Sequence, residues 1–144
     1  PADARIEVAE LFPEIVQWNR TFMKGLNGDA LEDPRVEVRV EDVRAVIRQA
    51  AGAPYDVIAL DIDNDTTAMV DDQNNKLYEA GGLREIWRAL KPGGRAAIWS
   101  ACPDSVLERR LKKVGFHVQG VPAKVSASSK REAYMIYLAD KAAP

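Results

Sequence analysis

The pattern of apolar and polar residues predicts six β-strands. Residues 4–11 and 35–40 alternate apolar with charged side chains, which is typical of a strand with one buried face. Residues 55–61 instead contain an unbroken apolar run, residues 57–60, as expected for a strand of a parallel sheet covered by helices on both faces. The remaining predicted strands are residues 95–100, 116–121 and 132–139.

Helical patterns separate the first five of these strands. The predicted helices cover about residues 13–24, 42–51, 83–90 and 103–114, and each is followed by glycine or by the sequence KPGG. Alternation of strand and helix requires parallel strands joined by right-handed crossovers. The last two strands are joined by a loop of about ten residues, too short for a helical crossover, so we expect them to pair antiparallel. The predicted fold class is therefore α/β, with a mainly parallel, Rossmann-like sheet flanked by helices and an antiparallel strand at its C-terminal end.

Composition narrows the range of functions. The chain has 144 residues, of which 47% are hydrophobic and 29% charged, which suits one globular domain. The formal net charge of -2 gives no reason to expect a nucleic-acid partner, and no apolar run is long enough to span a membrane. A single cysteine and a single histidine exclude a Cys/His zinc site and an internal disulfide, so we predict no metal and a cytoplasmic location.

Acidic residues follow three of the predicted strands. Glu10 ends the first strand, Asp42 follows the second, and Asp61 and Asp63 follow the third. In a parallel sheet these ends share one edge, where ligands bind. Clustered carboxylates repel one another unless a cation or a hydrogen-bond donor is present. Each acid alone could be an ordinary feature, and Asp42 could be only a helix cap. The set together predicts a site for hydroxyls, an amine or a metal.

Four segments of the chain resemble the spermidine synthase-like branch of the class I S-adenosylmethionine-dependent methyltransferase fold. They are IEVAELFPEIVQWNR, DPRVEVRVEDVRAVI, YDVIALDIDN and LYEAGGLREIWRALKPGGRAAIWS. The resemblance implies one domain over residues 1–144 with a methyltransferase-type sheet. It also implies a transferase, aminopropyltransferase-like or methyltransferase-like, that uses S-adenosylmethionine or its decarboxylated form and acts on a small-molecule amine or another acceptor.

The resemblance assigns cofactor contacts to the first two strand ends. Glu10 matches the family acid that accepts hydrogen bonds from both ribose hydroxyls, a task that suits a carboxylate. Asp42 matches the acid beside the adenine amino group. Val43 follows it and is expected to line the same pocket.

The resemblance also assigns the acceptor site. Asp61 matches the acid that takes a proton from the attacking amine, which needs a free lone pair to react. Asp63 and Asn64 are the expected substrate-binding residues. In spermidine synthases a second Asp and then Pro stand here, where this chain has Asn64 and Asp65.

The family's first strand and its glycine-rich turn have no counterpart, since no G-x-G-x-x-G or G-x-G-x-G pattern occurs in the sequence. We therefore expect a domain without its N-terminal βα unit, truncated at that end. The absent strand would lie between the first and third predicted strands, so both would have an open edge. This predicts weak cofactor binding by the chain alone. It also predicts a homo-oligomer or association with the missing N-terminal segment.

Two other classes of protein remain open from the sequence. A receiver domain of two-component signalling would use Asp61 as phosphoacceptor, with Ser100 and Lys124 as its hydroxyl and lysine partners. Its sheet would lack the antiparallel strand at residues 132–139. Alternatively, the domain could be a non-catalytic oligomerisation module of the same fold, as the absent glycine-rich turn allows.

Overall fold

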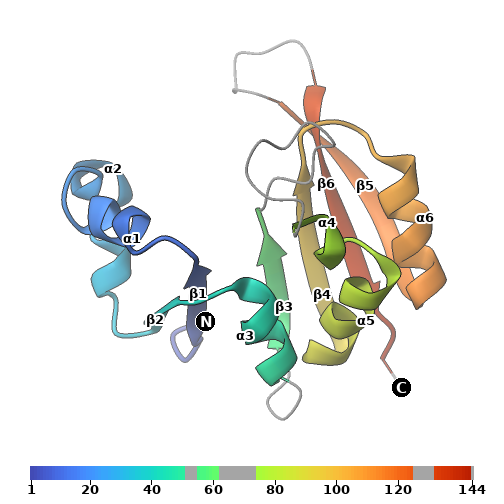
Figure 1. Cartoon of the computed structure of the whole chain (residues 1–144), viewed down its shortest axis with the longest axis horizontal. Helices are drawn as coiled ribbons and strands as arrows, with labels where there is room; N and C mark the ends of the chain where they lie inside the picture. Colours follow the sequence, from blue (N-terminus) through green and yellow to red (C-terminus); the bar gives the residue numbers. More distant parts are fainter. Residues whose placement is uncertain (51–54, 62–73, 125–131, 144) are drawn as a thin grey trace. The chain divides into compact units, whose positions relative to one another are not determined.

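The computed structural model describes residues 1–50, 55–61, 74–124 and 132–143. The chain divides into two compact units, Pro1–Gln49 and Ala50–Pro144, drawn in Figure 1. The assignment of residues 1–144 to one domain stays a prediction.

The first unit is a pair of parallel strands with its helices. Strands β1 (Ile6–Glu10) and β2 (Val36–Val40) pair in register from Ile6 opposite Val36 to Glu10 opposite Val40. Pro13 begins the first helix at a position where its missing N–H costs nothing. The other elements of the unit are α1 (Pro13–Arg20), α2 (Lys24–Asn27), the 3₁₀ turn η1 (Ala30–Glu32) and α3 (Val43–Gln49).

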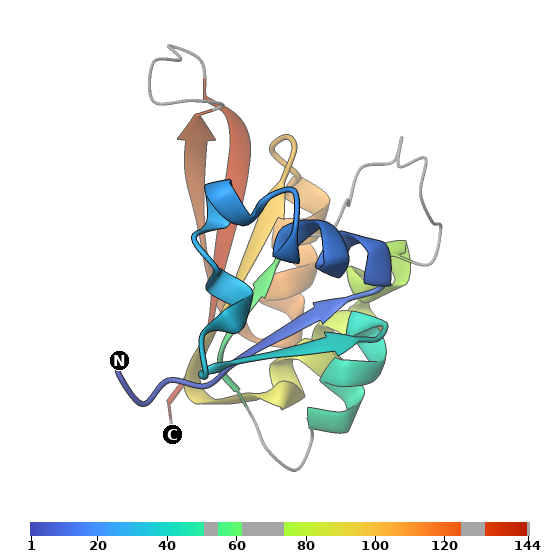
Figure 2. The ribbon, with the colours of Figure 1, turned by 90° about the vertical axis from the view of Figure 1, so that its left-hand side faces the viewer.

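The second unit is a four-stranded sheet with helices on one face (Figures 1 and 2). Its strands lie in the order β3-β4-β6-β5; β3 and β4 are parallel, whereas β6 is antiparallel to both β4 and β5. The predicted antiparallel pairing of the last two strands is thus confirmed. The elements are β3 (Tyr55–Leu60), α4 (Asn74–Leu77), α5 (Ala80–Ala89), β4 (Leu90–Ser100), α6 (Ser105–Val114), β5 (Phe116–Lys124) and β6 (Glu132–Lys141).

Alternation along the strands divides this sheet into a buried face and an open face. Ile58, Ile98 and Tyr137 are buried, together with Leu83 of α5 and Leu111 of α6. Their neighbours along the strands point the other way: Val57 is 62% exposed and Ala59 is exposed as well. The helices of this unit therefore cover one face only.

The KPGG sequence (91–94) differs from its prediction. We expected it to end a helix and lie before a strand at residues 95–100, but β4 already begins at Leu90. Tyr55 pairs with Leu90 and Val57 with Arg95, so the extra residues of β4 form an irregularity in the ladder. Glycine is required at position 94, because a Cβ there would lie 2.9 Å from the carbonyl oxygen of Lys91.

The strand order argues against the receiver alternative. A receiver needs its fifth strand beside its fourth, but here β6 lies between β4 and β5. Lys124 ends β5, two strands away from Ser100 at the end of β4, and the Ser100 hydroxyl donates to the carbonyl oxygen of Cys102 over 2.7 Å. Asp61, Ser100 and Lys124 are thus not arranged as a phosphoacceptor site requires.

Among the helices that the structure describes, none has both the length and the apolar character needed to cross a membrane.

Candidate cofactor and acceptor sites

Parallel pairing brings two of the predicted acidic strand ends together. Beyond the last paired residues, the N–H of Glu41 donates to the carbonyl oxygen of Glu10 over 3.1 Å. Glu10 and Glu41 are therefore neighbours at the carboxyl edge of the first unit, and Asp42 follows directly. Val43 is the first residue of α3 and half-buried, so it lies beside this edge.

The Glu10 carboxylate is held in place by the turn that follows β1. The backbone N–H of Phe12 donates to Oε1 of Glu10 over 2.9 Å. No other described group bonds to this carboxylate, so Oε2 and the remaining lone pairs of Oε1 can accept hydroxyl donors. A fixed carboxylate with spare acceptor capacity fits a ribose.

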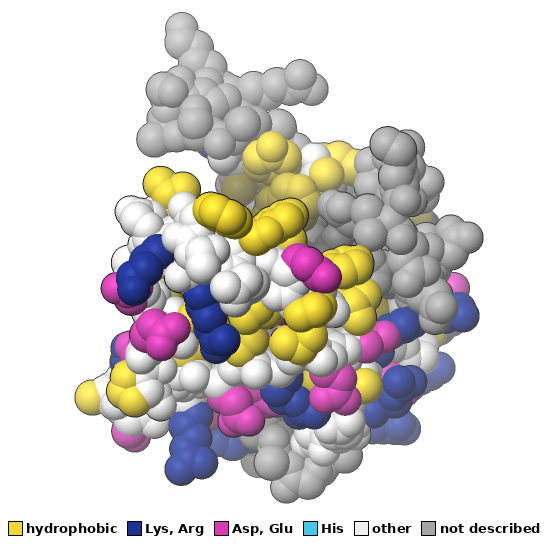
Figure 3. Space-filling view, turned by 60° about the vertical axis from the view of Figure 1, so that its left-hand side comes forward, with side chains coloured by type: hydrophobic (Ala, Val, Ile, Leu, Met, Phe, Trp, Pro, Cys, Tyr) yellow, Lys and Arg dark blue, Asp and Glu magenta, His cyan; other side chains and the backbone are white. Residues whose placement is uncertain are grey.

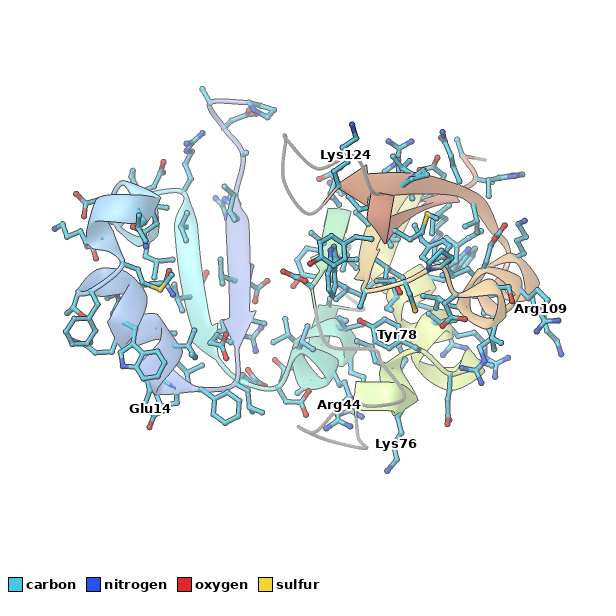
Figure 4. The ribbon with its side chains drawn as sticks, turned by 90° about the horizontal axis from the view of Figure 1, so that it is seen from above. Glu14, Arg44, Lys76, Tyr78, Arg109 and Lys124 are labelled. Atoms are coloured by element: carbon cyan, nitrogen blue, oxygen red, sulfur yellow. The ribbon has the colours of Figure 1, made fainter. Side chains whose placement is uncertain are left out.

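Asp42 also caps helix α3, the ordinary role that the sequence left open for this residue. Its Oδ1 accepts the backbone N–H of Arg44 over 2.8 Å at the start of α3. The Arg44 side chain, labelled in Figure 4, donates from Nε over 3.1 Å to each oxygen and from Nη2 over 2.5 Å to Oδ2. These bonds from Arg44 lower the pKa of Asp42. To accept an adenine amino group, Asp42 has to share an oxygen with Arg44.

A charged network next to this edge was not predicted. Arg39 donates to Oε1 of Glu7 over 2.8 Å, to Glu41, and to Oε1 of Gln49 over 2.5 Å. Gln49 in turn donates to Oε1 of Glu41 over 2.8 Å. Glu41 therefore accepts hydrogen bonds from both β2 and α3 and links these two elements. Glu10 and Asp42 remain as the candidates for ligand binding. Strict alternation of charge in residues 35–40 was the only sequence signal for this network.

In the second unit, Asp61 lies directly after β3 and is exposed. The preceding residue, Leu60, pairs with Ile98 of β4, so Asp61 lies at the carboxyl edge of this strand pair. The other predicted acceptor residues, Asp63 and Asn64, lie outside the described residues. Within the described ranges, no group of three or more His, Cys, Asp or Glu side chains is placed to hold a metal ion.

Curated relatives of the chain share one enzyme name. A polyamine aminopropyltransferase of Mycobacterium tuberculosis is 29% identical over 107 residues, which cover 73% of this chain and 20% of that enzyme. A polyamine aminopropyltransferase of Prochlorococcus marinus is 28% identical over 102 residues, covering 71% of this chain and 34% of the enzyme. The chain therefore corresponds to only a fifth to a third of these relatives. No family model matches the chain.

Solved structures give the same picture of the fold. A spermidine synthase in complex with the transition-state analogue AdoDATO superposes with a TM-score of 0.77 at 18% identity, covering 97% of this chain and 47% of that one. Human methyltransferase-like protein 13 in complex with SAH superposes with a TM-score of 0.72 at 22% identity, covering 97% and 62%. The chain has the fold of the spermidine synthase-like branch of class I S-adenosylmethionine-dependent methyltransferases.

Proposed function

We propose that this chain carries the nucleoside-binding and acceptor-binding residues of a spermidine synthase-like transferase that uses S-adenosylmethionine or its decarboxylated form. The observation that carries the proposal is the Glu10 carboxylate, oriented by the N–H of Phe12 at the carboxyl end of a parallel strand. The likeness to polyamine aminopropyltransferases supports the same reaction class.

When bound, the cofactor supplies an electrophilic carbon next to a sulfonium. The chain's own residues hold and orient its nucleoside end. Glu10 accepts hydrogen bonds from the ribose hydroxyls, and Asp42 accepts one from the adenine amino group while Arg44 keeps its carboxylate ionised. Val43 forms an apolar wall beside Asp42.

Asp61 prepares the acceptor for attack. An alkylammonium first loses a proton to the Asp61 carboxylate, and the freed nitrogen lone pair then forms the new N–C bond as the C–S bond breaks. The electron pair of the C–S bond stays on sulfur, which becomes a neutral thioether. The exposure of Asp61 at the end of β3 lets the proton pass on to solvent.

Isothermal titration with S-adenosylhomocysteine and methylthioadenosine tests the cofactor assignment. Glu10→Gln and Asp42→Asn should each weaken binding, by about tenfold for a lost hydrogen bond to a charged group. Glu37→Gln is the matched control, because Glu37 is an exposed acid within β2 rather than at its end. Unchanged affinity in both test variants would remove Glu10 and Asp42 from the site.

The proposed enzyme needs more polypeptide than these strands supply. Among the described strands, β1 pairs only with β2 and β3 only with β4, so each has one edge without a strand partner. Strand β3 carries neither lysine nor proline to protect that edge. We propose that a second copy of the chain or another polypeptide pairs with these edges, and that cofactor affinity is poor until it does.

Sedimentation equilibrium at micromolar concentration tests this association. The chain alone should sediment as a dimer or larger species. A cooperatively folded, monodisperse species of 15.9 kDa would contradict the proposal and would mean that the edges are satisfied within one chain.

A further inference from the structure

A single arginine of the first unit joins the three elements β1, β2 and α3. The Arg39 guanidinium in β2 donates from Nη1 to Oε1 of Glu7 in β1 over 2.8 Å. Its Nη2 donates to Oε1 of Gln49, the last residue of α3, over 2.5 Å, and also to the Glu41 carboxylate. The ends of the same three elements carry the candidate nucleoside-binding residues, which are Glu10, Asp42 and Val43.

The network converges on Glu41, which lies between the two candidate carboxylates. The Glu41 N–H donates to the carbonyl oxygen of Glu10 over 3.1 Å, and Asp42 is the next residue along the chain. The Glu41 carboxylate accepts hydrogen bonds from Arg39 and, over 2.8 Å, from Nε2 of Gln49. Both the backbone and the side chain of Glu41 are therefore held, and the peptide that joins Glu41 to Asp42 is held with them.

Arg39 also supplies the positive charge that lets several acids share this part of the unit. Hydrogen bonds to Glu7 and then to Glu41 raise the pKa of Arg39 above its ordinary value. Only 26% of the Arg39 side chain is exposed, so solvent screens these contacts less than at an open surface. The forked, charge-assisted hydrogen bonds of a guanidinium have a defined geometry, which a lysine ammonium does not reproduce.

We propose that Arg39 is a positioning residue that sets the separation between the Glu10 and Asp42 carboxylates. It acts through Glu41, whose backbone is joined to both. This inference rests on the proposed function and deepens it, because it adds a residue that acts on the nucleoside site without touching the ligand. Two carboxylates that grip opposite ends of one nucleoside need a fixed separation, so an edge that shifts loses affinity although both acids are still present.

Another ion pair of the first unit shows how a purely local contact differs. Arg35 precedes β2 and donates to Asp33, two positions earlier in the chain, over 2.7 and 3.0 Å. Within the described part of the chain, Arg35 makes no hydrogen bond to Glu41 or to either candidate carboxylate. Arg39 instead reaches Glu7, 32 positions earlier, and so joins separate elements at the edge where the candidate site lies.

Titration calorimetry of the whole chain with S-adenosylhomocysteine tests the positioning role. Arg39→Met keeps an unbranched side chain and removes the guanidinium, so the affinity should fall roughly three- to thirtyfold. Arg39→Lys restores the charge without the fork and should lose less. Arg35→Met is the matched control: it removes an ion pair at the other end of the same strand and should bind as wild type. A contact that only stabilised the fold would change the number of sites per chain and leave the affinity of each folded site as it was.

Amide hydrogen exchange of the ligand-free chain measures the same effect without the cofactor. The Glu41 N–H should exchange faster in Arg39→Met than in wild type, because its bond to the Glu10 carbonyl oxygen is no longer braced. The same amide should exchange at the wild-type rate in Arg35→Met. Gln49→Met removes the contacts to α3 alone and carries the test if Arg39→Met does not fold, with a smaller change in the same direction expected in both measurements.

The outcomes separate this inference from the proposed function. Equal affinity of wild type and folded Arg39→Met for S-adenosylhomocysteine overturns the inference and leaves the proposed function intact, as does an equal loss of affinity in Arg35→Met. No binding by folded wild type contradicts the proposed function. Faster exchange of the Glu41 amide in Arg39→Met alone would then still support the positioning role. Unchanged exchange of that amide overturns it.

Discussion

The two units bury their apolar side chains to very different degrees. In the second unit Leu83, Ile86 and Leu111 have no exposed surface at all. In the first unit Phe22 is 83% exposed and Leu26 is 86% exposed. Among the residues that the structure describes, ten large apolar residues are exposed and eight of these belong to the first unit; part of this surface is visible in Figure 3.

The difference shows which part of the chain carries its own core. A unit of about fifty residues buries too little surface to be very stable alone. The first unit relies on charged contacts such as the Arg39 network, and apolar side chains in and between its helices α1 and α2, such as Phe22 and Leu26, remain exposed. The unit with the stronger cofactor candidates is therefore the one that most needs a partner, which agrees with the proposed association.

The largest expected effect comes from the core of the second unit. Ile86→Ala in α5 removes a fully buried side chain, so we expect the free energy of unfolding to fall by about 2–5 kcal/mol. Phe22→Ser removes an exposed ring of the first unit and should change the free energy of unfolding by less than about 0.5 kcal/mol. Urea denaturation of both variants measures the contrast.

Equal losses of unfolding free energy in Ile86→Ala and Phe22→Ser would contradict the difference in burial between the two units. A large loss in Phe22→Ser would mean that the ring is buried in solution, for example against a second copy. Repeating that denaturation at several protein concentrations would then show whether the lost stability depends on association.

The sequence could predict the elements and the pairing because hydrophobic periodicity and chain connectivity determine both. Residues 4–11, 35–40 and 55–61 form strands close to their predicted bounds, and the short final loop correctly implied an antiparallel pair. The irregular start of β4 was missed because it depends on the backbone of another strand: the Asp56 carbonyl oxygen lies 3.0 Å from where a Cβ of Gly94 would be. Local turn residues give no signal of such a contact.

The candidate site was predictable only as a set of strand-end acids. The sequence placed Glu10 and Asp42 at neighbouring strand ends, and parallel pairing brings them to one edge. It could not show that Arg44 donates hydrogen bonds to both oxygens of Asp42, or that Leu60, the residue before Asp61, pairs with Ile98. Both facts depend on side-chain geometry and strand register, which spacing along the chain does not determine.

A smaller effect is expected at the C-terminal end of α5. Lys141 donates from Nζ to the carbonyl oxygens of Trp87 over 2.8 Å and of Leu90 over 2.6 Å, and the same ammonium lies over the Trp87 ring. A cation here satisfies carbonyls that a helix end leaves without partners. Lys141→Met keeps the apolar stem and removes the charge, so it should cost about 1–2 kcal/mol of unfolding free energy.

Lys113→Met is the matched control for this variant. Lys113 lies in the last turn of α6, and the described residues offer it no hydrogen-bond partner. Replacing Lys113 with methionine should leave the urea midpoint of the protein almost unchanged. Equal midpoints for Lys141→Met and wild type would show that the second unit does not depend on this cation, and would narrow the difference between the two units.

The smallest expected effect concerns a local carboxylate of the first unit. Asp33 accepts hydrogen bonds from the backbone N–H of Arg35 over 2.9 Å and from its guanidinium over 2.7 and 3.0 Å, which lowers the pKa of Asp33 to about 2 from its ordinary value of 3.8. Because the pKa of Asp33 is lowered in the folded state, this carboxylate stabilises the folded state at pH values above its ordinary pKa, and the contribution is lost as the pH falls from 3.8 towards 2.

Carbon-13 NMR of the Asp33 side chain should therefore show a titration midpoint at about 2. In Arg35→Gln the midpoint should move towards 3.8, because the guanidinium is the leading cause of the shift. A wild-type midpoint already near 3.8 would mean that this pair does not form in solution, and that charged contacts hold the first unit less firmly than its hydrogen bonds indicate.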